Sequence, residues 1–202
     1  MSAYTSDIAF TEAVKKVQQS KGSRGVYARM ETGKGWQQDM PDAVQDFIRA
    51  RDHFYLGTAT ADGQPYIQHR GGDVGFLKII DNRTLAFADF TGNRQYITTG
   101  NLSENNKAYI FLIDYTNRRR IKLWGTARVE TDTKSIAALV DSDYHGSPES
   151  AMYFDVLAWD INCPQHITER YDKQTVVEMI EPLQRRIDDL QNQIKQLTSN
   201  SR

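Results

Sequence analysis

The sequence FYLGTATADGQPYIQHR at residues 54–70 opens a series of short runs of strand-like composition that ends at residue 129. Further runs of this kind are GFLKII at 75–80, TLAFADF at 84–90, KAYIFLIDY at 107–115 and RRIKLWGTARV at 119–129. The dipeptides Asp62-Gly63 and Asp81-Asn82 separate neighbouring runs, and both favour tight turns. Several closely spaced short strands predict a mainly β fold with flanking helices, in the form of an antiparallel β-barrel.

The run at 119–129 indicates how this barrel is packed, because its residues alternate in polarity. Alternate residues of a strand share a face, so four side chains are expected to point to the core: Ile121, Leu123, Ala127 and Val129. The outward face then carries Arg120, Lys122, Trp124 and Arg128. Such a face fits a subunit interface, an anionic aromatic ligand, or a basic surface exposed to solvent.

Length, charge and cysteine content limit the classes of protein to which this chain can belong. Its 202 residues fit one domain with short appendages and suffice for a core without disulfides. There are 25 Lys and Arg against 26 Asp and Glu, so the net charge of −1 predicts neither a nucleic-acid nor a membrane partner. The single cysteine, the absence of a signal-like N-terminus and the lack of an apolar run of about 20 residues predict a cytoplasmic protein.

Helices are expected on both sides of the barrel strands. Residues 7–19 have the periodicity of an amphipathic helix, whereas the Gly-rich and polar segment 20–40 predicts an irregular arm. Pro41 suits the first turn of a second helix, PDAVQDFIRAR, and residues 132–140 predict a short third one. Residues 152–161 predict the last strand.

The end of the chain has a different pattern from the rest. Its apolar residues are spaced alternately by four and three: Val176, Ile180, Leu183, Ile187, Leu190, Ile194 and Leu197. This heptad pattern predicts a coiled coil, with packing on the chain's own barrel as the alternative, and Pro182 is expected to bend or interrupt the first turns. The sequence thus divides into an N-terminal helix and arm at 1–40, a barrel domain at 41–171 and a C-terminal helix at 172–202.

Polar and cationic side chains gather near two turns and suggest a site for an anion, most simply a phosphate. In the loop TGNRQY, Gly92 allows a close backbone approach, and Arg94 offers the planar fork that suits phosphate oxygens. In PYIQHRGG, strand alternation places Gln68 and Arg70 on one face and His69 on the other. Each signal is weak alone, because a surface turn before an arginine and a histidine in a strand both have ordinary structural explanations.

The segment CPQH contains Cys163 and His166, which are residue types that bind metals or take part in nucleophilic catalysis. A metal site needs two more ligands at suitable spacing, and a thiol nucleophile needs a base held beside it. The sequence shows neither, so no metal site is predicted. A structural turn that brings Gln165 or His166 near the ligand is the preferred interpretation.

Taken together, these segments resemble the pyridoxamine 5′-phosphate oxidase-like proteins, the FMN-binding split β-barrels. The resemblance covers about residues 41–160, through LGTATADGQPYIQHR, TLAFADF, TGNRQY, ENNKAYIFLIDY and RRIKLWGTARVE. The segments GSRGVYAR and WDINCPQHITERY and the heptad tail resemble an uncharacterised flavin-nucleotide-binding subgroup. The resemblance implies a split, Greek-key barrel that forms a homodimer, with one FMN in each of two grooves between the subunits.

The resemblance also implies which residues hold FMN. One strand would touch the flavin and its phosphate, the end of another would lie along the flavin, and a loop would grip the phosphate. The corresponding positions are Gln68, His69, Arg70 and Gly71, then Ala88 and Asp89, then Gly92, Asn93 and Arg94. Arg120 stands where a glutamine of the partner subunit usually approaches the ring, and Gln165 and His166 complete the set of candidates.

The chain departs from the family pattern at three points. Asn93 stands where an arginine is usual, and four extra residues occur within ITTGNLSENN. The Arg-containing motif near the C-terminus that binds the phosphate of the pyridoxal substrate is not recognisable. Pyridoxamine phosphate oxidase activity is therefore not expected.

Three functions are compatible with these features. The first is an FMN-dependent oxidoreductase that transfers hydride or electrons to or from an unidentified small molecule. The second is a non-enzymatic flavin-binding or redox-sensing protein, and the third is a barrel without flavin whose tail binds another protein. A deazaflavin in place of FMN and a higher oligomer formed through the tail also stay open, and no catalytic residue is assigned.

Overall fold

The structure is a computed structural model that describes residues 4–141, 146–161 and 164–199. The chain separates into two compact units. The first contains residues 1–114 and 119–164, and the second contains residues 115–118 and 165–202. The first unit holds the sheet and the N-terminal arm, and the second holds the long C-terminal helix.

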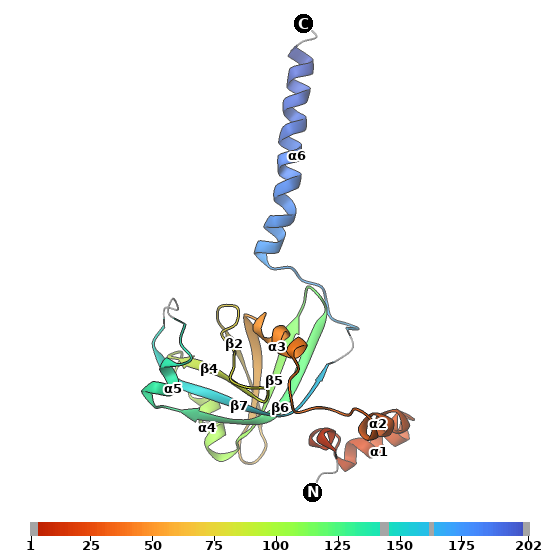
Figure 1. Cartoon of the computed structure of the whole chain (residues 1–202), viewed down its shortest axis with the longest axis vertical. Helices are drawn as coiled ribbons and strands as arrows, with labels where there is room; N and C mark the ends of the chain where they lie inside the picture. The colour runs from red at the N-terminus through yellow and green to blue at the C-terminus, as the bar shows by residue number, and fades with distance from the viewer. Residues whose placement is uncertain (1–3, 142–145, 162–163, 200–202) are drawn as a thin grey trace. The chain divides into compact units, whose positions relative to one another are not determined.

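Seven antiparallel strands form one sheet, in the spatial order β2-β1-β5-β6-β7-β4-β3 (Figure 1). Their bounds are His53–Ala59 for β1, Pro65–Gly71 for β2, Lys78–Ile79 for β3, Thr84–Phe90 for β4, Lys107–Asp114 for β5, Arg119–Glu130 for β6 and Pro148–Ile161 for β7. Strands β5 to β7 are neighbours in both the chain and the sheet, whereas β1 pairs with β5 and β4 with β7. These longer connections are of Greek-key type, and the predicted fold class is confirmed.

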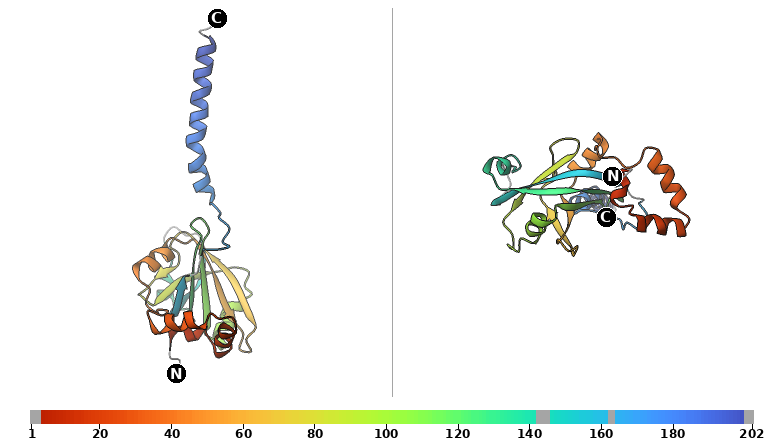
Figure 2. Two further views of the ribbon diagram at one scale, coloured as in Figure 1. Left: turned by 90° about the vertical axis from the view of Figure 1, so that its right-hand side faces the viewer. Right: turned by 90° about the horizontal axis from the view of Figure 1, so that it is seen from below.

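The sheet curls until strands from its two halves share one core (Figure 2). Phe54 on β1 contacts Phe87 on β4, with ring centroids 5.3 Å apart, although three strands separate β1 from β4 in the sheet. The side chains predicted to face inward on β6 are buried, apart from Val129, which is partly buried and packs on the same cluster. Other members of this core are Met40, Val44, Phe47, Ile48, Leu56, Leu85, Ile110, Leu112 and Phe154.

Both predicted hairpin turns are present. Gly63 has a φ of 96°, which an L side chain rarely adopts, and the N–H of Thr60 donates to the carbonyl of Gln64 over 3.0 Å. At the next hairpin, Oδ1 of Asp81 accepts hydrogen bonds from the backbone N–H groups of Arg83 and Thr84, at 2.7 and 2.8 Å. The side chain of Asp81 thus holds the turn that its sequence predicts.

A glycine is also required at one point in the pairing of β6 with β7. The register between the two strands shifts between Trp124 and Gly125. A Cβ atom at Gly125 would lie 2.2 Å from the carbonyl oxygen of Asp155 and 2.7 Å from the ring of Phe154. The strands therefore approach too closely at this bulge for any side chain.

The N-terminal region contains more helix than the sequence predicts. The helix expected at 7–19 is confirmed only over its second half, as α1 (Glu12–Ser20), because its first residues belong to a separate 3₁₀ turn, η1 (Thr5–Ile8). The prediction of an irregular arm at 20–40 is wrong for α2 (Arg24–Thr32), which includes Gly25 and ends before Gly33. An ion pair between Arg24 and the buried carboxylate of Glu31 links the two ends of α2.

The last part of the arm lies against the outward face of β6. The ring of Trp36 stacks on that of Trp124, with centroids 4.6 Å apart and planes 20° apart, and Nζ of Lys122 lies 5.1 Å from the Trp124 ring centroid. Nearby, the indole N–H of Trp159 donates to the carbonyl of Asp39 over 2.9 Å. Part of the outward face, for which the sequence suggests an interface, a ligand or solvent, is therefore covered by the chain itself.

Four further helices complete the described chain. Three of them confirm predictions, α3 (Asp42–Arg49), α5 (Thr133–Ala137) and the C-terminal helix α6 (Lys173–Ser199), whereas α4 (Ile97–Glu104) is not predicted. The longest, α6, continues through Pro182, so the expected interruption is wrong, and none of its residues is buried. Within the described ranges, no helix combines the length and apolar composition needed to cross a membrane.

Candidate functional site

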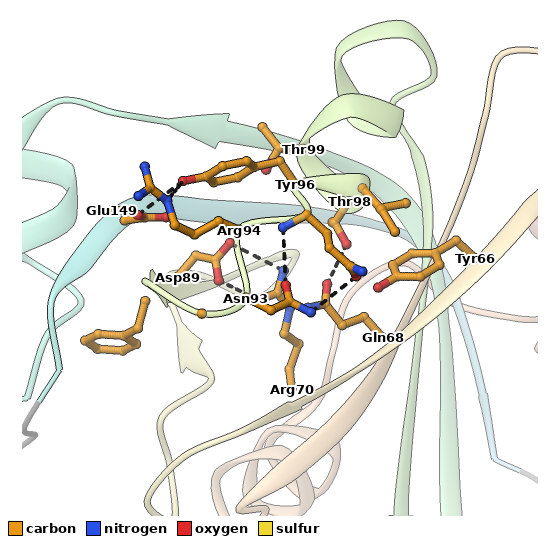
Figure 3. A pocket seen from close by; sticks show the side chains of 14 residues that line it. Tyr66, Gln68, Arg70, Asp89, Asn93, Arg94, Tyr96, Thr98, Thr99 and Glu149 are labelled. Atoms are coloured by element: carbon orange, nitrogen blue, oxygen red, sulfur yellow. Dashed lines mark hydrogen bonds and ion pairs between the residues drawn. The ribbon is translucent and has the colours of Figure 1, made fainter.

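A cavity of about 310 Å³ lies where the end of β2 approaches the end of β4 (Figure 3). Its walls are Tyr66, Gln68, Arg70, Asp89, Phe90, Gly92, Asn93, Arg94, Gln95, Tyr96, Ile97, Thr98, Thr99 and Glu149. Six of the residues singled out in the sequence therefore lie together: Gln68, Arg70, Asp89, Gly92, Asn93 and Arg94. They come from β2, from β4 and from the loop after β4, and since the two strands are far apart in the order of the sheet, the cavity exists only because the sheet curls.

Strand β2 supplies one wall of the cavity through alternate residues. Tyr66, Gln68 and Arg70 are half-buried and line it, whereas the residues between them are exposed, as the alternation predicts. The guanidinium of Arg70 forms an ion pair with Asp89 on β4, and only 14% and 18% of the two side chains is exposed. Nε of Arg70 is buried and has no hydrogen-bond partner among the described residues. The cavity wall thus contains a fixed cation, and the Nε–H of this arginine is available as a hydrogen-bond donor.

The loop after β4 supplies the second cation. Arg94 and Tyr96 have φ values of 59° and 53°, a left-handed conformation that costs non-glycine residues free energy and is common at functional sites. Nε of Arg94 donates to the hydroxyl of Tyr96 over 3.2 Å, and that hydroxyl donates to Oε1 of Glu149 over 3.4 Å. The hydrogen bond to Tyr96, together with the charge of Glu149, raises the pKa of the Arg94 guanidinium. Arg94 therefore stays a cation beside the cavity.

Helix α4 begins at the cavity, directly after this loop. Its N-cap residue is Tyr96, whose side chain makes no capping hydrogen bond, and its first turn contains no acidic residue. The first N–H groups of a helix lack partners within the helix and favour a nearby anion. Oγ1 of Thr98 donates to Oε1 of Gln68 over 2.7 Å, which ties the start of α4 to β2. The helix start therefore adds donors to the same wall as the two arginines.

A second, smaller cavity of about 170 Å³ continues along β4. It shares Arg70, Asp89 and Phe90 with the first and is also lined by His69, Gly71, Phe76, Phe87 and Ala88. Three more candidates, His69, Gly71 and Ala88, thus border a surface with aromatic side chains. On the exposed side of β2, the His69 ring stacks on that of His53, with centroids 5.7 Å apart. The two cavities together offer a polar, cationic end and a flatter, more apolar end.

Three predicted residues do not line these cavities. Arg120 lies on β6 near Tyr109, whose phenol has a pKa raised by burial and by the charge of Asp160 and lowered by that of Arg120. Gln165 and His166 form a turn in the second unit, so their part in the site stays a prediction. Cys163 lies outside the described residues. Within the residues that the structure covers, no group of three metal-binding side chains occurs.

The sequence did not identify several residues of the cavity, among them Tyr66, Tyr96, Thr98, Thr99 and Glu149. Tyr66 could have been found, since it shares the face of Gln68 and Arg70 by strand alternation. The threonines belong to the segment that the family resemblance marks as an insertion. Glu149 comes from a distant part of the chain, and no local pattern links it to Arg94.

A curled antiparallel sheet with a cavity lined by two arginines between strands of its two halves fits the class of split β-barrel proteins. A family model described as "Pyridoxamine 5'-phosphate oxidase" matches residues 40–162, well over half of the chain, and the chain belongs to this family. No significantly similar sequence occurs among curated proteins.

Several solved structures are similar to this chain at low sequence identity. HupZ from Group A Streptococcus superposes with a TM-score of 0.51 at 18% identity, over 65% of this chain and 99% of that one. An FMN-binding protein from Syntrophomonas wolfei has a TM-score of 0.45 at 13% identity, over 77% of this chain and 98% of that one. A protein related to general stress protein 26, from Clostridium acetobutylicum, has a TM-score of 0.48 at 15% identity, over 66% and 94%.

Proposed function

We propose that this protein binds FMN and acts as an oxidoreductase on a small molecule. The observation that carries the proposal is the convergence of Arg70, Arg94 and the start of α4 on one cavity. A phosphate dianion needs cations and N–H donors at short range, and this end of the site contains both. The adjoining cavity offers the flat, partly aromatic surface that a fused ring system needs.

The described residues fit the phosphate of a flavin nucleotide in three respects. Arg94 is an exposed cation. Its neighbours are the hydroxyl of Tyr96, which accepts a hydrogen bond from Nε, and the carboxylate of Glu149. Nε of Arg70 is a buried donor without a partner in the described chain, which is a costly state unless a ligand completes it. Gly92 leaves the backbone of the loop accessible, because its Cβ position meets little more than the carbonyl of Phe90 at 4.0 Å.

The ring system would extend from this cavity along the end of β4. Gly71 and Ala88 are the small residues there, and Phe76 and Phe87 provide apolar surface beneath them. Arg70 would lie between the phosphate and the ring, since it borders both cavities. The chain would bind and orient the flavin, and a bound flavin would supply the hydride or electron transfer.

The proposed active form is a homodimer with a flavin in each of two grooves between subunits. In such a dimer, Arg120 of one subunit would approach the ring bound mainly by the other. A positive charge at the ring's N1–C2 edge stabilises the reduced flavin, because reduction places negative charge there. Arg120 is suited to this role because its Nε is buried without a hydrogen-bond partner in the described residues.

Binding is tested by titrating the purified protein with FMN and with riboflavin, which lacks the phosphate. We expect Arg94→Ala to weaken FMN binding by about tenfold or more, the scale of a lost charge-assisted contact, with little effect on riboflavin. Arg49→Ala is the matched control, because Arg49 is an exposed arginine on α3 that pairs with Asp46. Equal affinity of wild type and Arg94→Ala for FMN would refute the phosphate assignment.

Enzyme activity is tested separately, by stopped-flow reduction of the flavin-loaded protein with NADPH and NADH. Rapid bleaching of the flavin absorbance supports an oxidoreductase. If no nicotinamide donor reduces the bound flavin, the result favours a flavin-carrying or redox-sensing role over an enzymatic one. Titration with a deazaflavin in the same assay decides which of the two cofactor classes the site prefers.

A further inference from the structure

The long helix α6 carries an apolar stripe that the described chain leaves in solvent. The seven side chains of the stripe are between 39% and 69% exposed: Val176, Ile180, Leu183, Ile187, Leu190, Ile194 and Leu197. Since α6 is continuous from Lys173 to Ser199, these residues follow one narrow line along its surface. Burial of such a stripe in a paired helix would remove several large apolar side chains from water.

The identity of these residues specifies the kind of partner. In the heptad assignment, the three a positions within the stripe are isoleucine, namely Ile180, Ile187 and Ile194, and Lys173 occupies the a position at the start of the helix. The d positions are Val176 and three leucines, Leu183, Leu190 and Leu197. Isoleucine at a with leucine at d favours two parallel strands over trimers or tetramers. We propose that α6 pairs with α6 of a second copy of this chain, as a parallel, in-register, two-stranded coiled coil.

The charges that flank the stripe favour pairing with an identical helix. The e and g positions are almost entirely uncharged: Val177, Met179, Gln184, Arg186, Gln191, Gln193 and Thr198. In a parallel pair, Arg186 faces Gln191 of the second copy, so its guanidinium meets an amide oxygen and no like charge. The charged residues lie on the outer face, at Glu178, Glu181, Arg185, Asp188, Asp189 and Lys195. From Val176 to Leu197, no like charges therefore meet at the seam of two identical helices, and only Lys173 in the first turn would face its own copy.

Pro182 is compatible with this arrangement. It occupies a c position, on the side of the helix that faces away from the seam. Its missing N–H removes one backbone hydrogen bond there, while the neighbouring stripe residues Ile180 and Leu183 keep their places in the continuous helix. The proline therefore does not interrupt the surface that would pair.

Parallel, in-register pairing limits the tail contact to two chains. Such a pair has one two-fold axis along its length, so the contact closes at two copies of α6.

Disulfide trapping in the full-length chain tests the proposal. In a background with Cys163→Ser, which removes the only cysteine, single cysteines are placed at two d positions, Leu183→Cys and Leu197→Cys. The d residues of a parallel pair meet their own copies, so both proteins should form a disulfide-linked dimer under mild oxidation. Asn192→Cys, at an outer f position, is the matched control and should cross-link about tenfold less.

The two positions separate the possible orientations. They are 14 residues apart, or about 21 Å along the helix, so an antiparallel pair can bring at most one of them against its own copy. Adding Ile187→Asp to the Leu197→Cys protein should abolish the cross-link, whereas adding Gln196→Asp, on the outer face, should not. Cross-linking at only one d position or at neither would overturn the proposal, and so would equal cross-linking at Asn192→Cys. None of these readouts depends on flavin.

Discussion

The barrel and the C-terminal helix use the same apolar residue types in opposite ways. In the barrel, side chains such as Ile110, Leu112 and Leu123 are fully buried by the chain's own strands. In α6, Ile187, Leu190 and their neighbours face solvent, and no residue of the helix is buried. The barrel thus contains the partners for its own hydrophobic surface, whereas α6 buries none of its residues within its own unit. Substitutions in each region, with their effects on unfolding and on FMN binding, test this comparison.

The largest expected effect is loss of barrel stability after truncation of a core aromatic. Phe154 is 1% exposed and packs where β6 and β7 approach most closely, so Phe154→Ala should lower the free energy of unfolding by about 3–5 kcal/mol. Ile187→Ala in α6 should change barrel unfolding by less than about 0.5 kcal/mol. Chemical denaturation followed by tryptophan fluorescence measures both. A large effect of Ile187→Ala on this transition would show that the stability of the barrel depends on α6, which contradicts the comparison.

The next effect concerns the ion pair that joins β2 to β4. Arg70→Ala removes the partner of a mostly buried Asp89, and we expect it to destabilise the barrel by about 1–3 kcal/mol and to weaken FMN binding. Arg128→Ala is the control, because Arg128 is about half exposed and its pairs with Glu130 and Asp155 should contribute only about 0–1 kcal/mol. If the two substitutions had equal effects on unfolding and on FMN affinity, Arg70 would not have the special position assigned to it.

A smaller effect is expected at Glu149, in the opposite direction. Its carboxylate lies near the proposed phosphate position, where like charges repel. Glu149→Gln keeps the size of the side chain and its capacity to accept the Tyr96 hydrogen bond, so it should tighten FMN binding about two- to fivefold, more at low salt than at high salt. Isothermal titration of FMN into the wild type and Glu149→Gln at two salt concentrations measures this difference in affinity. Weaker binding, or no dependence on salt, would show that Glu149 lies away from the phosphate.

The smallest effect on the flavin site should follow removal of the tail. A chain ending at Tyr171 lacks α6 but keeps every residue that lines the two cavities. We expect it to bind FMN with unchanged affinity and to stay a dimer in light scattering, because the barrel contact should suffice. A monomeric product would mean that the tail is the main contact between subunits.

The sequence predicted the elements in which local pattern and final environment agree. The hairpin turns at Gly63 and Asp81, the alternation of β6 and the heptad stripe of α6 all follow from short-range periodicity and turn chemistry. Nine of the twelve candidate residues line the cavities, and most of the nine came from the family resemblance, not from these local patterns. What they could not provide was the convergence of β2 and β4, which depends on the curl of the whole sheet.

The two helices that were not predicted show why other parts of the fold could not be inferred from the sequence. Helix α4, ITTGNLSE, contains a glycine and three β-branched residues, which are poor helix formers. It forms because Leu102 is buried and Nδ2 of Asn101 donates to Oγ1 of Thr58, 3.0 Å away on β1. Helix α2 is held by a buried ion pair and by contact between the rings of Phe10 and Tyr27, 5.1 Å apart. Tertiary contacts therefore overrode weak local preferences in both cases.

The stacked indoles of Trp36 and Trp124 give the protein a built-in optical reporter. All three tryptophans of the chain lie at the junction between the arm and strands β6 and β7, and the third, Trp159, donates to the carbonyl of Asp39. Intrinsic emission would therefore register both detachment of the arm and unfolding of strands β6 and β7. Because α6 contributes no indole, events at the tail would be invisible at these wavelengths, and a change in emission could be assigned to one end of the molecule without labelling.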